Sequence, residues 1–313
     1  MGNAVVSVIV TTVSRARLSD FRDLVDALKR QDHNDFELIV VVDENKEHYL
    51  DVKESVNDCN FPVKVEFNDN NLGLAHSRNL GIHLASGNIL AFIDDDAEPY
   101  SQWVRTIGEV FDDPTVGAVT GDIEPRWMVV GMNWFPKELF WMISCSYSIT
   151  PKERGEIDRG FGADMAFSRI AIEAVGTFDT RYGITKKRWI GGEDTEMFMR
   201  VNSSGYKVIY EPEMRVLHHI HPHRLRLENL IKRAIAQGRG TVILKRGMVG
   251  RAPDHSGKSY ILDTMFRFVP SKMKGLFTRD AMNNVRDIGL VLTINLFIVL
   301  GYVLEIVRPT DGN

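Results

Sequence analysis

Asn88-Ile89-Leu90-Ala91-Phe92-Ile93-Asp94-Asp95-Asp96 is the stretch that decides the fold. Its five apolar residues have no polar alternation, which is typical of a strand buried on both faces of a parallel sheet. Three adjacent aspartates cannot continue unpaired into that core, because an isolated buried carboxylate is costly. We therefore expect the strand to end at Ile93 and the aspartates to project at the carboxyl edge of the sheet, where open α/β sheets bind ligands.

The aspartates are candidate ligands for a divalent cation. Clustered carboxylates repel one another unless a cation lies among them, and hard cations favour oxygen ligands. Asp94 and Asp96 are two residues apart on an extended segment, so their side chains point the same way and could share one ion. A solvated acidic turn is the alternative, and for such a short pattern alone it is the commoner outcome.

Strands and helices alternate before this stretch. That alternation predicts a parallel sheet with helices on both of its faces. The second and fourth strands run directly into carboxylates, Asp43 and Asp94, which should therefore meet at one sheet edge. The pattern predicts strands at 5–10, 36–42, 63–67 and 89–93, and helices at 18–31, 49–57 and 74–85.

The rest of the chain is less regular. An aromatic stretch covers residues 134–147, and a glycine-rich passage covers residues 160–164. Four histidines, at 218, 219, 221 and 223, follow the last expected strand. The pattern predicts helices at 102–111, 170–175, 191–204 and 227–245, and strands at 117–120, 208–210 and 215–217.

Length, charge and cysteine content narrow the class of protein. The 313 residues suffice for one large domain or two modest ones. Residues 1–223 hold 23 Lys and Arg against 35 Asp and Glu, whereas residues 224–286 hold 14 against 4. A cationic segment after an acidic domain favours an anionic surface or ligand near the C-terminal part. Two cysteines form no disulfide framework and favour a reducing compartment, and the N-terminus has no signal-peptide layout.

The C-terminal part predicts a membrane contact. Residues 288–304 are mostly Ile, Leu and Val, near the lower length limit for a membrane span, and residues 265–269 and 272–277 mix cations with aromatics. A buried C-terminal helix is the alternative. If the helix spans, the cations before it outnumber the one after it, Arg308, which places the large domain in the cytoplasm. The cations before the helix are Lys272, Lys274, Arg279 and Arg286.

The order of these motifs resembles the family 2 inverting glycosyltransferases with the GT-A fold. The likeness covers roughly residues 5–224, and each motif alone is weak whereas their order and spacing are specific. It implies an α/β, Rossmann-like GT-A domain at 1–224, with a mostly parallel central sheet flanked by helices, and a basic helical extension at 225–313. The matching segments are 6–12, 71–75, 77–81, 85–96, 162–167 and 192–194.

The resemblance also implies a donor site for a nucleotide-diphosphate sugar. It places Mn²⁺ or Mg²⁺ at Asp96 and Asp94, where the ion would neutralise the departing diphosphate. Asp94 or Asp95 would accept hydrogen bonds from ribose, and Asp43 would bind the nucleobase. Glu44 and Asn45 follow Asp43 where the family often has a second acid, which leaves the base open. Thr11 and Thr12 would lie beside the base, and Arg78 near the nucleotide or, alternatively, in a surface ion pair.

Asp194 is the general base that the resemblance implies. It would deprotonate an acceptor hydroxyl that attacks the anomeric carbon opposite the diphosphate, with its pKa tuned by Glu193 and by burial. Capping of a helix N-terminus is the alternative reading. Asp164 would contact the donor or acceptor sugar, although many relatives carry Asn there. His218 or His219 would add a metal ligand, or else both are hydrogen-bonded or surface histidines.

The acceptor is inferred from the aromatic stretch at 134–147. It resembles enzymes that extend polyprenyl- or dolichyl-phosphate-linked sugars, such as the archaeal glucosyl-dolichyl phosphate glucuronosyltransferases, although a core helix explains it almost as well. The prediction is therefore a glycosyltransferase acting on a lipid-linked or glycan acceptor at the cytoplasmic side of the cell membrane, with no nucleic-acid partner. The rivals are a polyprenyl-phosphate glycosyl synthase, a non-catalytic nucleotide-binding scaffold and, more weakly, a nucleotidyltransferase.

Overall fold

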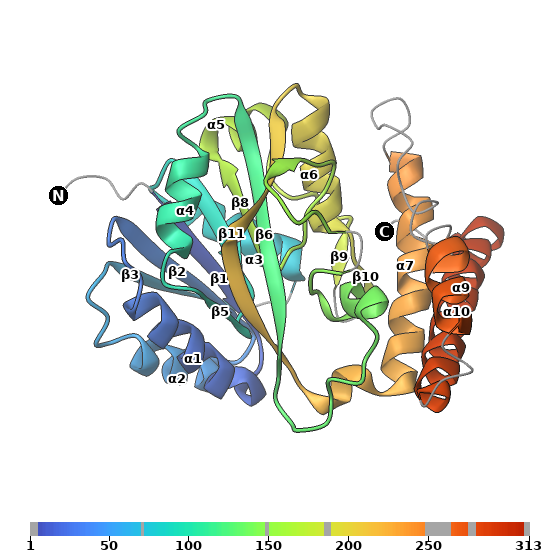
Figure 1. Ribbon diagram of the computed structural model, residues 1–313. Coiled ribbons are helices and arrows are strands. Elements are labelled where there is room, and N and C mark those ends of the chain that lie inside the picture. Colours follow the sequence, from blue (N-terminus) through green and yellow to red (C-terminus); the bar gives the residue numbers. More distant parts are fainter. Residues whose placement is uncertain are drawn as a thin grey trace. The chain divides into compact units, whose positions relative to one another are not determined.

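The computed structural model describes residues 6–69, 72–147, 150–184, 189–247, 264–274 and 280–309 (Figure 1). The chain forms two compact units: Met1–Arg126 with Pro151–His219, and Trp127–Thr150 with Ile220–Asn313. The aromatic stretch thus belongs to the second unit, and the domain boundary expected after residue 224 stays a prediction. Val5, Asn71, residues 275–277 and Arg279, which the sequence motifs included, lie outside the described residues.

The first unit is built on one large sheet with the strand order β3-β2-β1-β4-β8-β6-β11-β5, with β7 beside β11. Strands β1 to β4 pair in parallel, and β8 joins β4 in the antiparallel direction. The α/β class is confirmed. The strands are β1 (Val6–Thr12), β2 (Phe36–Asp43), β3 (Val63–Asn68), β4 (Ile89–Ile93), β5 (Ala97–Pro99), β6 (Val116–Trp127), β7 (Gly155–Glu156), β8 (Asp164–Ser168) and β11 (Lys207–Ile220), and a small second sheet joins β9 (Gly183–Ile184) to β10 (Trp189–Ile190).

Helices pack on the sheet through apolar faces. All five residues of β4 are buried, as expected for a strand covered on both sides. Leu90 and Phe92 belong to a core cluster with α3, α5 and α6. Helix α1 buries Phe21 and Leu24 at helical spacing. The helices of this unit are α1 (Leu18–Lys29), α2 (Lys46–Ser55), α3 (Leu74–Leu84), α4 (Trp103–Val110), α5 (Arg169–Val175) and α6 (Glu193–Ser203), with a 3-10 turn at Arg15–Arg17.

The expectation of two short strands at 208–210 and 215–217 is wrong, because β11 is continuous. Pro212 lies inside it without breaking it. Strand β7 pairs with Ile209 and Tyr210, and β5 pairs from Val216 onward, so Pro212 falls between the two paired segments. A proline, which has no N–H to donate, is tolerated at such an unpaired edge position.

The second unit is helical apart from the strand ends that enter it. Its elements are the 3-10 turns Lys137–Ile143 and Pro222–Leu225, α7 (Leu227–Gly247), the π-helical turn Thr264–Phe268, α9 (Val269–Lys274) and α10 (Ala281–Val307). The aromatic stretch is therefore a 3-10 turn and loop, and most of its large side chains, such as Phe135 and Phe140, are buried. It forms core of this unit and offers no broad aromatic surface for a lipid.

Candidate active site

The carboxyl ends of three parallel strands bring the predicted donor residues to one edge of the sheet. In the register, Thr12 of β1 pairs with Val42, one residue before Asp43 at the end of β2. Strand β4 lies on the other side of β1 and ends at Ile93, so Asp94 begins at the same edge. The fold thus gathers Thr12, Asp43 and Asp94 as the sequence predicts.

Asp94, Asp96 and His218 form a cluster that could hold a metal ion. One ligand atom from each residue lies within 4.8 Å of the others. His218 Nε2 lies 3.1 Å from Asp96 Oδ1, and both side chains are buried. His218 reaches this place because β11 pairs with β5, where His218 lies opposite Ala97, the residue after Asp96. Two carboxylates and an imidazole are a suitable donor set for Mn²⁺.

His219 lies with a different group of residues. Adjacent residues of a strand point to opposite faces, so His219 turns away from the acid pair. Its Nδ1 lies 3.0 Å from Asp20 Oδ1, and its Nε2 contacts Glu98. The structure therefore separates the two histidines and brings only His218 to Asp94 and Asp96.

Arg17 pairs with two of the three adjacent aspartates, Asp94 to Asp96, which we call the acid triplet. Its Nη1 lies 2.6 Å from Asp95 Oδ1 and 3.5 Å from Asp96 Oδ2. Burial raises the pKa of Asp95 to about 6, and Arg17 opposes that rise. Asp95 in turn, above all, raises the pKa of Arg17. The buried Asp95 thus pairs with the partly exposed Arg17 and lies outside the metal cluster.

Arg78 links the acid triplet to helix α6. Its Nη1 donates to Glu193 Oε1 at 2.9 Å, its Nη2 lies 3.5 Å from Asp94 Oδ1, and the Phe178 ring lies 5.6 Å from the guanidinium. Burial, and next the neighbouring Asp194, raise the pKa of Glu193 to about 7, although Arg78 lowers it. Arg78 is therefore a buried bridge and not the surface ion pair considered from the sequence.

Asp194 faces the glycine-rich passage. Its Oδ2 accepts a hydrogen bond of 2.8 Å from Gly162 N, and its Oδ1 accepts one of 2.7 Å from Thr195 N. A side chain at position 162 would come within 3.0 Å of both Arg78 Nη2 and Asp194 Oδ2, so glycine lets the loop approach these two groups. The carboxylate is thereby fixed in the first turn of α6, near the Arg78 bridge.

Asp43, the residue expected to bind the nucleobase, is hydrogen-bonded to other residues of the protein. Ser77 Oγ donates to Asp43 Oδ2 at 2.6 Å, and Asn68 Nδ2 donates to Asp43 Oδ1 at 2.8 Å. Burial raises the pKa of Asp43, against these two bonds. Thr12 Oγ1 lies 2.9 Å from Nε2 of the buried His48, and Thr12 also bonds to Asp95. Thr11, the neighbour of Thr12 on β1, is partly exposed.

Asp164 lies opposite Ile93, next to Asp94, but its carboxylate is turned into the core. It is fully buried, and its Oδ1 accepts a hydrogen bond of 2.8 Å from the Trp103 indole, so it is not presented to a ligand at the sheet edge. Burial raises its pKa well above the usual range. Its expected contact with a sugar stays a prediction.

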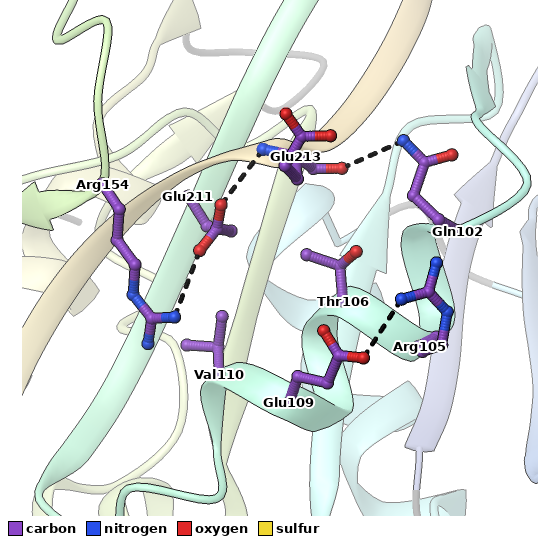
Figure 2. A pocket seen from close by; sticks show the side chains of 8 residues that line it. All are labelled: Gln102, Arg105, Thr106, Glu109, Val110, Arg154, Glu211 and Glu213. Carbon is purple, nitrogen blue, oxygen red and sulfur yellow. Dashed lines mark hydrogen bonds and ion pairs between the residues drawn. The ribbon is translucent and has the colours of Figure 1, made fainter.

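A shallow polar hollow elsewhere on the first unit contains none of the predicted site residues (Figure 2). Its charged side chains pair with one another: Arg154 with Glu211 at 3.4 Å, and Arg105 with Glu109 at 3.1 Å. The acidic sheet edge is the stronger candidate site, because it brings Asp94, Asp96 and His218 together.

Comparison with known families decides the class of protein. Residues 7–176 match the family model of glycosyl transferase family 2. The chain is a family 2 glycosyltransferase. It is 27% identical over 306 residues to the glucosyl-dolichyl phosphate glucuronosyltransferase of Haloferax volcanii, covering 97% of both chains, and 21% identical to the Haloferax volcanii glycosyltransferase AglE over 76% of this chain and 73% of that one.

Solved structures place this glycosyltransferase in the GT-A fold. The mannosyltransferase PcManGT from Pyrobaculum calidifontis, in complex with GDP-Man and Mn²⁺, superposes with a TM-score of 0.66 at 20% identity, over 99% of this chain and 88% of that one. GalNAc-T7 with UDP, GalNAc and Mn²⁺ gives a TM-score of 0.56 at 18% identity, over 87% and 58%. The predicted family and fold are confirmed.

Sequence reasoning missed three residues that contact predicted site residues of this glycosyltransferase. Arg17 and His48 contact the predicted residues Asp95 and Thr12. Both lie within six residues of the end of a strand whose carboxyl end reaches the site, and this proximity is the signal that could have found them. Trp103, the partner of Asp164, gave no such signal because it comes from the start of α4.

Proposed function

We propose that this glycosyltransferase moves a sugar, with inversion, from a nucleoside-diphosphate donor to a hydroxyl of a polyprenyl- or dolichyl-phosphate-linked sugar. The observation that carries the proposal is the meeting of Asp94, Asp96 and His218 at the sheet edge, between Asp43 and the helix that bears Asp194. The similarity along 97% of the chain to an enzyme named for glucosyl-dolichyl phosphate supports the acceptor class.

The donor set fits Mn²⁺ or Mg²⁺ held by Asp94, Asp96 and His218. The imidazole favours Mn²⁺, because Mg²⁺ prefers oxygen ligands. When bound, the ion would supply positive charge to the departing diphosphate. Arg17 already shields Asp95 and Asp96 from each other, which leaves Asp94 as the more exposed carboxylate of the triplet.

The nucleotide end is assigned to the residues next to this cluster. Asp43 would bind the nucleobase with Thr11 and Thr12 beside it, although Asp43 must exchange its bond from Ser77 or Asn68 to do so. Asp94 and Asp95 are the candidates for ribose. The 2.9 Å pair between Arg78 and Glu193 would hold the start of α6 next to the bound donor. Asp164 would meet a sugar only after its buried carboxylate turns from Trp103.

Asp194 would accept the proton of the attacking hydroxyl. The two backbone N–H groups that bond to it fix its orientation, which is what a general base needs. Replacing Asp194 by Asn keeps the size of the side chain and one acceptor oxygen but removes the basic group. The transfer rate should then fall by about 10² to 10⁴, the usual contribution of a general base.

The test is transfer from a panel of UDP-, GDP- and dTDP-sugars to a polyprenyl-phosphate sugar, with Mn²⁺ or Mg²⁺ present. Glu196→Gln is the control, because Glu196 lies in the same helical turn but pairs with Arg200. Full activity of Asp194→Asn would contradict its role as base and favour a phosphate acceptor, which is already ionised. Tight nucleotide binding with no turnover of any donor would favour a non-catalytic scaffold.

The proposed setting is the cytoplasmic face of the cell membrane, with a catalytic domain at 1–224 and a membrane-associating region at 225–313. By length and composition, α10 could cross a membrane. The excess of cations in residues 224–286 supports contact with anionic lipid headgroups.

A further inference from the structure

Helix α10 presents an apolar surface that no described residue of its own unit covers. We call this surface the outer face. Its residues recur every three or four positions, so they lie along one side of the helix. Leu296, at its middle, is 65% exposed. The outer face comprises Met282, Val285, Leu292, Leu296, Val299, Leu300, Val303 and Val307, all of them exposed.

The opposite side of α10 is buried, and three polar residues lie there among the apolar Val291, Ile294 and Ile298. Asp287, Asn295 and Glu305 are 5%, 6% and 1% exposed. Lys272 donates to Asp287 at 2.8 Å. A helix at the surface of a protein in water turns a polar side to the solvent. Helix α10 instead is apolar on its exposed side as well as within its buried side, which indicates that the outer face meets an apolar medium.

Helix α10 is joined closely to α7. A Cβ on Gly238 would overlap the carbonyl oxygen of Ile298, and a Cβ on Gly301 would overlap that of Ile235, so the two backbones touch. Farther along, Arg246 reaches the Glu305 carbonyl oxygen at 3.5 Å. Figure 1 shows the two helices side by side along their lengths. Wherever α10 lies, α7 must therefore lie beside it.

Helix α7 cannot enter the hydrocarbon of a bilayer. It carries five cations along its 21 residues, and Arg239, near its middle, alone would cost about 2.5 to 3.5 kcal/mol at the bilayer centre on insertion scales. The cations are Lys232, Arg233, Arg239, Lys245 and Arg246. A spanning α10 would have to separate from α7 and expose Asp287, Asn295 and Glu305 to lipid. An α10 lying in the plane of the membrane keeps the pair intact.

The segment just before α10 has the side chains of a membrane interface. Phe266 and Met273 are exposed apolar residues, with the exposed cations Arg267 and Lys274 beside them. Lys272 lies 5.5 Å over the Phe268 ring. Cations next to apolar side chains suit an anionic lipid surface, where the apolar groups enter and the charges stay at the headgroups.

We propose that α10 attaches this glycosyltransferase to the membrane as an in-plane helix, with its outer face in the headgroup and acyl boundary and with α7 on the aqueous side. This deepens the proposed membrane setting and chooses the in-plane arrangement over the spanning one. The inference rests on the second unit alone, so it is tested without donor or acceptor. Loss of transfer with intact vesicle binding would overturn the proposed function and leave this inference standing.

The test measures depth in vesicles of mixed anionic and zwitterionic lipid. Val285→Cys, Leu296→Cys and Val303→Cys are made separately in full-length protein that carries Cys59→Ser; the remaining Cys145 is fully buried. Each variant is labelled with an environment-sensitive fluorophore and quenched with lipids brominated at shallow or deep positions. Residues 285 and 303 are about 27 Å apart along the helix axis. An in-plane helix gives one shallow depth for all three labels, whereas a spanning helix places Leu296 much deeper than Val285.

Binding without labels gives the second readout. Leu296→Glu should weaken sedimentation with anionic vesicles by at least tenfold, because it puts a charge in the centre of the outer face. Ile170→Glu, at an exposed apolar residue of α5, is the matched control and should leave vesicle binding unchanged. A deep Leu296 label would overturn the in-plane arrangement. So would a wild-type protein that does not bind vesicles but forms a dimer that Leu296→Glu dissociates, because a second copy would then cover the outer face.

Discussion

Glu193 should make the stability of this glycosyltransferase depend on pH. Burial and the neighbouring Asp194 raise its pKa from the usual 4.5 to about 7, against the effect of Arg78. Between these two values the folded protein holds a proton that the unfolded chain has released. The free energy of unfolding therefore decreases as the pH rises from about 4.5 to 7. Since one pKa step corresponds to about 1.4 kcal/mol, the loss is about 3 kcal/mol.

Replacing Glu193 by Gln removes this titration and keeps an oxygen that can accept from Arg78. The assay is urea unfolding of both proteins, without divalent metal, at pH values from 4.5 to 8. A difference in the free energy of unfolding that is the same at every pH reports the altered pairing with Arg78. Only the part of the difference that changes with pH reports the titration of Glu193. The free energy of unfolding of the wild type should fall by about 3 kcal/mol relative to that of Glu193→Gln across this range. Parallel curves would show that Glu193 is ionised throughout, and the argument from its burial would be refuted.

Two further predictions concern packing and buried polar groups, and both are measured by chemical denaturation. Gly238→Ala should destabilise the protein by about 1 to 3 kcal/mol, because the new methyl group meets the Ile298 carbonyl. Gly289→Ala, in an open part of α10, should be neutral or stabilise by up to about 1 kcal/mol, and equal effects at the two glycines would contradict the close crossing. Trp103→Phe should cost about 1 to 3 kcal/mol because it leaves the buried Asp164 carboxylate without its indole donor, and an unchanged stability would show that this bond is unimportant.

The parallel half of the sheet could be predicted from the sequence because its signals are local. Five apolar residues followed by aspartates defined β4 to the residue, and the spacing of Phe21 and Leu24 defined α1. The meeting of Asp43 and Asp94 followed from the rule that parallel strands end at one edge. These inferences needed no knowledge of distant contacts.

Contacts made by the antiparallel half of the sheet could not be predicted in this way. The choice between His218 and His219 depends on the register of β11 against β5, and a shift of one residue would exchange them. The burial of Asp164 depends on Trp103, which lies 61 residues away. The glycine crossing of α7 and α10 likewise joins segments that share no local pattern.

Metal binding at the acid triplet tests the central claim most directly. Titration calorimetry with Mn²⁺, in the absence of nucleotide, should show a site that depends on Asp94, Asp96 and His218, and a second group, Asp23, Glu98 and His219, allows a separate event to be seen. His218→Gln and Asp96→Asn should each weaken the first site at least tenfold, since each removes one of three ligands. His219→Gln, whose side chain lies with Asp20 and Glu98, should leave the affinity of the Asp94, Asp96 and His218 site unchanged. Equal loss at this site in the two histidine variants, or Mn²⁺ binding at this site that survives Asp96→Asn, would contradict the account.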